Sequence, residues 1–140
     1  MNNINKRPKW VLVILVWFVY SGLFGMKQFY DVITHALVMP EGFPYPSVIE
    51  SFIQSFCFQF IYMVAAILLF FRVSANRWLF LIMLALYIPS ILYSLLSGSV
   101  PESHMQTIII AGIITFIFYA LITKYTFRLV ATNYYVSSNN

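Results

Sequence analysis

Four long apolar stretches divide the chain, and short polar segments lie between and outside them. Apart from Lys27 near the end of the first stretch, they carry no charged side chain. A helix needs about 20 apolar residues to cross the hydrocarbon core of a bilayer, whereas a membrane strand needs only ~9–11. We therefore predict membrane-spanning helices over about residues 10–30, 51–71, 78–97 and 105–123.

These spans predict an all-α, polytopic integral membrane protein with a single four-helix transmembrane domain over residues 1–140. Backbone polar groups in hydrocarbon must bond within their own segment, which favours helices. The tight turn from Arg72 to Arg77 predicts that the second and third spans are antiparallel neighbours. Each span also has one face of small or polar residues suited to a bundle interior, so we expect an antiparallel four-helix bundle. The remaining segments are predicted to be an outer loop at about 31–50 and a disordered tail at 136–140.

The composition argues against a soluble protein. Charged residues make up 9% of the chain and hydrophobic residues 61%, whereas about 25% of residues are charged in a typical globular domain. The formal net charge of +4 is not a nucleic-acid footprint, because no basic cluster with interleaved stacking aromatics lies outside the spans. We therefore expect a lipid bilayer, and no nucleic acid, as the surroundings of this chain.

The distribution of basic residues predicts an orientation. If the chain crosses four times, seven cations share one side: Lys6, Arg7, Lys9, Arg72, Arg77, Lys124 and Arg128. Lys27 and all four acidic residues fall on the other side. The positive-inside rule then places both termini in the cytoplasm and suits a bacterial cytoplasmic (inner) membrane. We interpret the first span as a retained anchor, because its apolar run exceeds the 7–15 residues usual in a signal peptide.

The predicted outer loop contains the first candidate site, formed by Asp31, His35, Glu41 and Glu50. In a functional interpretation these residues bind a cation or relay a proton. In the alternative, which we favour, Asp31 and His35 belong to a solvated helix face and the proline-rich segment after them is a rigid connector. A single histidine with scattered carboxylates is weak evidence for a metal site. Ser47 and Glu50 match a capping box at the start of the second span.

A second candidate site consists of polar residues inside the spans, which we expect to face the bundle interior. They are Gln54, Ser55, Gln59, Ser90, Ser94 and Thr115. They either line a polar pathway or form hydrogen bonds between helices, which are worth about 0.6 kcal/mol each. Ionisable residues are the usual mark of ion pathways and proton relays. None lies at the centre of a span, so we favour the interhelical role.

No pattern indicates an enzyme, a metal site or a cofactor. Cys57 is the sole cysteine, so the chain has no redox pair, and it lacks the glycine-rich patterns that bind phosphate or dinucleotides. We therefore expect a non-enzymatic interaction or accessory protein, such as a subunit, assembly factor or immunity-type protein, with a membrane-protein partner or a second copy. The alternative is a small transporter or channel for a neutral or lipid-like molecule. A membrane enzyme that uses His35 and the outer carboxylates is the least favoured hypothesis.

Overall fold

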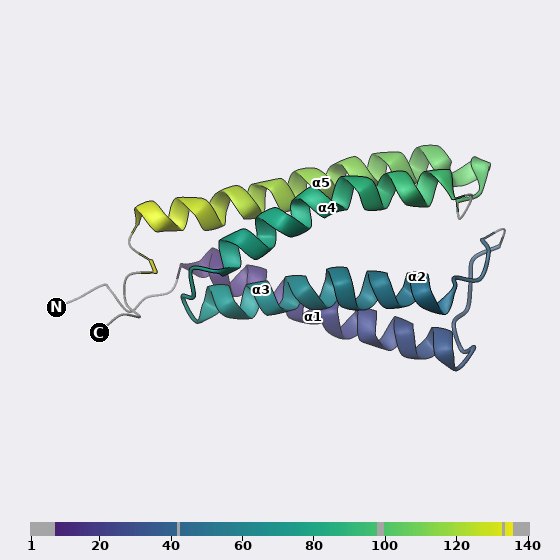
Figure 1. The fold of residues 1–140 in the computed structure, drawn as a ribbon, viewed down its shortest axis with the longest axis horizontal. Helices are drawn as coiled ribbons and strands as arrows, with labels where there is room; N and C mark the ends of the chain where they lie inside the picture. The colour runs from purple at the N-terminus through teal and green to yellow at the C-terminus, as the bar shows by residue number, and fades with distance from the viewer. Residues whose placement is uncertain (1–7, 42, 98–99, 133, 136–140) are drawn as a thin grey trace.

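The structure is a computed structural model that describes residues 8–41, 43–97, 100–132 and 134–135. Over these residues it is all-helical, and four of its helices are long and apolar enough to cross a membrane, which confirms this part of the prediction. The elements in chain order are α1 (Lys9–Ile33), α2 (Val48–Phe52), the π-helix η2 (Ile53–Phe60), α3 (Ile61–Phe70), α4 (Asn76–Leu96) and α5 (Glu102–Ala131). The second span is the continuous run of α2, η2 and α3 (Figure 1).

Two helices extend beyond the predicted spans because their polar ends continue the helical pattern. α1 runs to Ile33, and its last turns include an ion pair between Lys27 and Asp31, which are four residues apart. α5 continues past Thr123 as far as Ala131. At about 1.5 Å per residue, the 30 residues of α5 exceed the roughly 30 Å hydrocarbon thickness. Its ends therefore reach the headgroup region of a bilayer.

A capping box begins the second span, as the sequence predicts. The backbone N–H of Glu50 donates to Ser47 Oγ at 3.1 Å, and the N–H of Ser47 donates to Glu50 Oε2 at 3.2 Å. These two bonds satisfy backbone donors that a helix start leaves without partners. The capping box therefore defines where the chain turns from the proline-rich connection into the second span.

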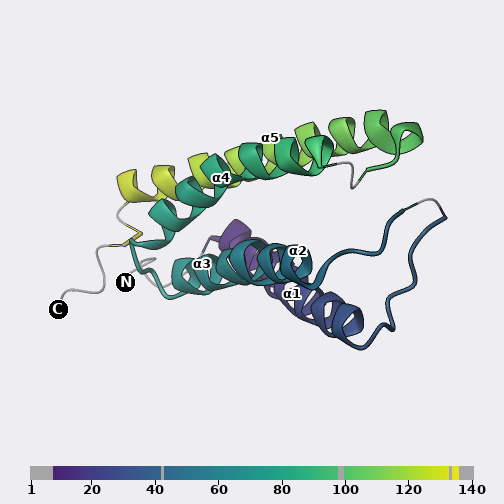
Figure 2. The ribbon, with the colours of Figure 1, turned by 45° about the vertical axis from the view of Figure 1, so that its right-hand side comes forward.

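The helices form two pairs. The second span lies against α1, and α5 lies against α4, while α3 and α4 join the pairs through the short turn at 71–75 (Figures 1 and 2). We call the end that holds Lys9, this turn and Ala131 the terminal end. We call the opposite end, with the connections 34–47 and 97–101, the loop end.

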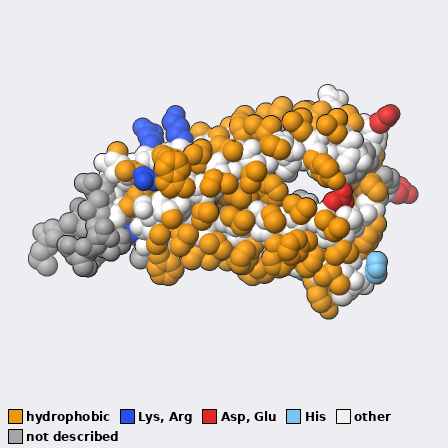
Figure 3. Space-filling model, viewed as in Figure 1, with side chains coloured by type: hydrophobic (Ala, Val, Ile, Leu, Met, Phe, Trp, Pro, Cys, Tyr) orange, Lys and Arg blue, Asp and Glu red, His pale blue; other side chains and the backbone are white. Residues whose placement is uncertain are grey.

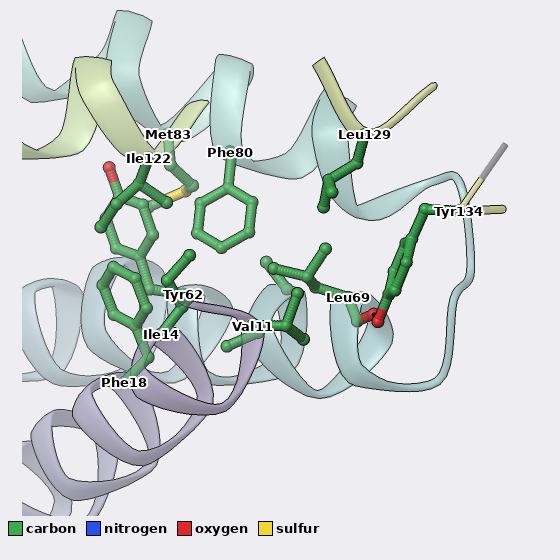
Figure 4. Packing of buried hydrophobic residues seen from close by; sticks show 12 residues of the cluster. Val11, Ile14, Phe18, Tyr62, Leu69, Phe80, Met83, Ile122, Leu129 and Tyr134 are labelled. Carbon is green, nitrogen blue, oxygen red and sulfur yellow. Dashed lines mark hydrogen bonds between the residues drawn. The ribbon is translucent and has the colours of Figure 1, made fainter. Parts of the chain in front are cut away.

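The hydrophobic core lies in the terminal half of the molecule (Figure 4). The ring of Phe18 stacks on Tyr62 with centroids 5.1 Å apart, and both rings contact Phe80. These three side chains come from α1, α3 and α4, so the cluster joins the two helix pairs. The centroid of Tyr119, on α5, lies 4.6 Å from that of Tyr62 and adds the fourth helix. Aromatic pairs at such distances contribute about 0.5–1.5 kcal/mol beyond their area burial.

Two tyrosines after α5 close the terminal end by hydrogen bonding. The hydroxyl of Tyr134 donates to the carbonyl of Leu69 at 3.1 Å, and the hydroxyl of Tyr135 lies 3.2 Å from Asn76 Oδ1 and from the carbonyl of Thr126. Burial raises the pKa of Tyr135, so its hydroxyl remains a neutral donor. The segment after α5 is therefore tied to both helix pairs.

Towards the loop end, close packing is found within each pair. A Cβ placed on Gly22 would lie 2.9 Å from the Cβ of Met63, so α1 and the second span approach closely at this glycine. Gly112 of α5 is packed against Ile91 of α4 in the same way. In α4, all buried residues lie between Asn76 and Met83. A hollow lies between the two pairs near the loop end (Figure 3).

The surface matches a hydrocarbon environment. Large apolar side chains are exposed along all four spans, whereas Lys and Arg, apart from the Lys27 that pairs with Asp31, gather at the terminal end and Asp, Glu and His at the loop end (Figure 3). A charged side chain at the bilayer centre costs at least about 2.5–3.5 kcal/mol on insertion scales. The charge-free middle of the molecule therefore indicates a membrane protein.

Two of the buried glycines, Gly22 and Gly112, give a matched test of this packing. We expect Gly22→Ala to destabilise the protein by about 1–3 kcal/mol, because the new Cβ would meet the Cβ of Met63, which cannot move without its backbone. Gly112→Ala should change stability by less than about 1 kcal/mol, because its Cβ would meet only Ile91 Cδ1, the far end of a flexible side chain. The midpoint of SDS-induced unfolding in mixed micelles measures both. Equal effects would contradict the close approach of α1 and the second span.

Candidate functional site

The acidic residues of the predicted outer site take part in local structure. Asp31 is paired with Lys27, and Glu50 belongs to the capping box. Glu41 is exposed in a turn, where no partner is found among the described residues. Among these residues, no three His, Cys, Asp or Glu side chains come together to hold a metal ion. The predicted outer site therefore remains a set of separate positions at the loop end.

His35 lies in the connection that leaves α1, with its backbone in the left-handed region at φ 53°. Its ring centroid is 5.7 Å from that of Tyr45, whose hydroxyl lies 3.3 Å from the carbonyl oxygens of Asp31 and Val32. Tyr45 thus folds the proline-rich connection back onto the end of α1. These contacts give His35 a structural environment and bring no nucleophile to it among the described residues.

The connection 34–47 touches the start of α5. The ring of Phe43 lies 5.0 Å from that of His104, in the first turn of α5. The sequence does not predict this contact, because neither ring belongs to a recognisable motif. It is the place where the loop ends of the two helix pairs touch.

The predicted interior residues occupy different environments. Ser55 is buried, Gln59, Ser90, Ser94 and Thr115 are half-buried, and Gln54 is exposed. Ser94 Oγ donates to the carbonyl of Ser90 at 3.1 Å, one turn back on the same helix. This use of a hydroxyl is common inside membrane helices. The grouping of all six residues around one pathway remains a prediction.

Two buried polar atoms lie in the interior without hydrogen-bond partners among the described residues. They are Gln59 Oε1 and the hydroxyl of Tyr62. Gln59 is directed at Gly25, where a Cβ would come within 1.8 Å of Oε1. The hydroxyl of Tyr62 points from α3 towards the α4–α5 pair (Figure 4). Each buried polar group of this kind destabilises the fold unless it is hydrogen-bonded.

Tyr62 belongs to a cluster of three tyrosines that the sequence did not reveal. Tyr62, Tyr87 and Tyr119 come from α3, α4 and α5, and the ring of Tyr119 lies 4.6 Å from Tyr62 and 5.5 Å from Tyr87. The hydroxyl of Tyr87 lies 3.5 Å from the carbonyl of Gly112. Tyrosines are usually found at the membrane interface. Their positions well inside predicted spans were the signal that could have identified the cluster.

A groove of about 730 Å³ lies between α1 and α5, and its walls are almost entirely apolar. α1 contributes Trp10, Val13, Ile14 and Trp17, and α5 contributes residues between Ile114 and Tyr125. Trp17 and Phe118 meet across it with ring centroids 5.9 Å apart. A second hollow of about 420 Å³ lies at the terminal end of α5, with Arg128 and Thr132 in its wall. Tyr125 lines both hollows, so they adjoin.

Cys57 lies in η2 with its side chain exposed. A thiol in the middle of a span is usually a small buried hydrophobe, whereas the side chain at this position of η2 is exposed. π-helical turns are rare and often accompany functional sites. Here η2 holds Ser55 and Gln59 on the inner side of the span and Cys57 on the outer side.

No protein-family model, curated protein or solved structure matches the chain. The function must therefore be inferred from the residues of the chain itself. The interior offers neutral hydroxyl and amide groups, and the grooves offer apolar walls with cations at the terminal end. Such groups suit binding to helices, lipids or neutral molecules.

Two buried tyrosines test the assignment of partners in the interior. Tyr62 is 2% exposed and Tyr134 is 7% exposed. The hydroxyl of Tyr134 donates to the carbonyl of Leu69, whereas the hydroxyl of Tyr62 has no partner among the described residues. We expect Tyr134→Phe to lower the free energy of unfolding by about 1 kcal/mol, and Tyr62→Phe to leave it unchanged or raise it. SDS-induced unfolding measures both variants. A loss of 1 kcal/mol or more in Tyr62→Phe would mean that its hydroxyl has a partner.

Proposed function

We propose that this chain is a non-enzymatic membrane protein that acts by lateral contact with another transmembrane helix, as an accessory subunit, assembly factor or immunity-type protein. The observation that carries the proposal is the hollow between the two helix pairs near the loop end (Figure 3). Without an aqueous phase to drive association, helices in lipid associate through close packing and interhelical hydrogen bonds. A hollow bordered by helices is a place where a further helix gains both.

The distribution of burial supports this location. The aromatic cluster joins the pairs in the terminal half, whereas no residue of α4 from Leu84 to Leu96 is buried. The half-buried residues Ser90 and Ser94 lie in this part of α4. Small hydroxyl residues are enriched where membrane helices pack together. The loop-end half of α4 is therefore suited to contact with a partner.

The proposal includes an orientation. Both termini lie in the cytoplasm, and the four helices form an antiparallel bundle in a bacterial inner membrane. The support is the position of four cations at the terminal end, opposite the acidic residues: Arg72 and Arg77 lie in and next to the turn between α3 and α4, and Lys124 and Arg128 lie near the end of α5. In this orientation the hollow opens in the outer leaflet, and a partner helix enters it from the side.

A photo-crosslinking experiment tests the contact. We place benzoylphenylalanine at Ser94, in the loop-end half of α4, and in a separate variant at the exposed Leu81, in the terminal half of the same helix. We expect irradiation of native membranes to give one discrete adduct from position 94 and none from position 81. Native mass spectrometry in mild detergent should show the same stoichiometric complex, either with a partner or with a second copy.

The contrasting result is equally clear. A strictly monomeric protein in native mass spectrometry, with equal and diffuse crosslinking from both positions, would contradict lateral contact through the hollow. The Leu81 variant controls for random collision with neighbouring membrane proteins, because its side chain faces outward on the same helix.

A second candidate function is the passage or binding of a neutral or lipid-like molecule. The specific observation in its favour is the pair of buried polar atoms without partners, Gln59 Oε1 and the hydroxyl of Tyr62. Gln59 Oε1 faces Gly25 of α1, whereas the hydroxyl of Tyr62 faces the α4–α5 pair (Figure 4), so a neutral molecule with a hydroxyl or amide group would supply a hydrogen bond to either one. The absence of charged side chains from the centres of the four spans suits an uncharged ligand.

Flux across proteoliposomes tests this second function. If the protein conducts a small neutral solute such as glycerol, Gln59→Leu should abolish the flux, because it replaces the amide in the interior by an apolar side chain of similar size. Gln54→Leu is the matched control, because Gln54 is exposed on the same span. Equal flux in wild type, in both variants and in empty liposomes would contradict this function.

A further inference from the structure

We propose that α1 and α5 form a binding site for one anionic phospholipid. An acyl chain occupies the groove between the two helices, and the phosphate lies on Lys124 and Arg128 at the terminal end. The site is separate from the loop-end hollow and does not depend on the function proposed above.

The groove has the chemistry and the length that an acyl chain requires. Its walls are apolar, with Val13 and Trp17 on one side and Phe118 on the other. Along α5 it runs from Ile114 to Tyr125, which is about 16 Å at ~1.5 Å per residue. That length is roughly half of the ~30 Å hydrocarbon core, so the groove spans one leaflet.

The second hollow has the chemistry that a phosphate requires. It adjoins the groove at Tyr125, and Arg128 and Thr132 lie in its wall. Lys124 is exposed one helical turn before Arg128. Because α5 is longer than the hydrocarbon core is thick, these residues reach the headgroup level. Along α5 towards its C-terminal end, the apolar groove is thus followed by a basic pocket. This order matches the acyl chain and the phosphate of a phospholipid.

The charge balance of the terminal end calls for an external anion. All four acidic residues, Asp31, Glu41, Glu50 and Glu102, belong to the loop end, and none forms an ion pair with Arg128. Basic pockets at the ends of membrane helices are a recurring form of anionic lipid recognition. Each nearby Lys or Arg strengthens such binding by about fivefold. A phosphodiester supplies the negative charge that no acidic side chain supplies at this end.

Native mass spectrometry of the full chain tests the proposal. The protein is placed in nanodiscs with equal amounts of 1-palmitoyl-2-oleoyl phosphatidylglycerol and the phosphatidylcholine with the same chains. It is then released into mild detergent, and the lipids that remain bound are counted. We expect one phosphatidylglycerol per chain, retained at least about tenfold over phosphatidylcholine. The double variant Lys124→Gln/Arg128→Gln removes two cations at about fivefold each and should abolish this preference, whereas Lys27→Gln, a change of charge at the loop end, should keep it.

The apolar part of the site has its own matched pair. Val13 and Leu12 are neighbours on α1 and are each 54% exposed, but only Val13 lines the groove. We expect Val13→Trp to fill the groove and reduce phosphatidylglycerol retention by about tenfold, and Leu12→Trp to leave it unchanged. Unchanged thermal stability of both variants in detergent separates loss of the lipid from loss of the fold.

Three results would overturn the proposal. The first is equal retention of phosphatidylcholine and phosphatidylglycerol. The second is full retention in Val13→Trp, which would place the lipid elsewhere. The third is displacement of the lipid by glycerophosphoglycerol or inorganic phosphate at equal concentration, which would show that the pocket binds a free phosphate and that the groove contributes nothing.

Discussion

The stacking of Phe18 on Tyr62 is the interaction on which the arrangement of the four helices depends. It lies where α1, α3 and α4 approach one another, and Phe80 and Tyr119 complete the contact. Lipid tails are as apolar as leucine, so burial of aliphatic side chains gives helices in a membrane little reason to associate. The aromatic rings, together with the hydrogen bonds of Tyr134 and Tyr135, supply the directional contacts that aliphatic burial does not. They hold the two helix pairs together at the terminal end.

Contacts between the two helix pairs are concentrated at the terminal end, and this explains why the two halves of the molecule differ in packing. Within each pair, glycines bring the backbones together along the loop-end half, as Gly22 and Gly112 do. Between the pairs, the described residues offer no comparable fastening there apart from the contact of Phe43 with His104. The loop-end half therefore has the fewest contacts that oppose a change in the spacing of the pairs. Regions with few buried contacts are those from which moving and binding elements are usually drawn.

Much of the fold was predictable from the sequence because the cost of burying charge in hydrocarbon is large. This cost predicts the number of spans, and the Ser47–Glu50 pattern predicts where the second one begins. The pairing of helices was not predictable, because the residues that face lipid and those that face a neighbour are both apolar. Tyr62 is buried and Tyr20 is exposed, yet both are tyrosines in apolar runs. The π-helix η2, in which Cys57 is exposed, was also not predictable, because its residues follow no recognisable pattern.

The candidate sites follow the same division. The sequence identified the polar residues of the spans, but Gln54 and Gln59 differ in exposure although both lie in η2. It also identified the cations of the terminal end as a topology signal without linking them to a groove, because that link requires the contact of α1 with α5. The two proposed contacts rest on different forces. A helix in the loop-end hollow is held by packing, which salt affects little, whereas a phosphate on Lys124 and Arg128 is held by charge, which salt screens within about 10 Å at 0.1 M ionic strength. A complex that dissociates in salt therefore belongs to the terminal end, and one that survives salt but not a change in packing belongs to the loop end.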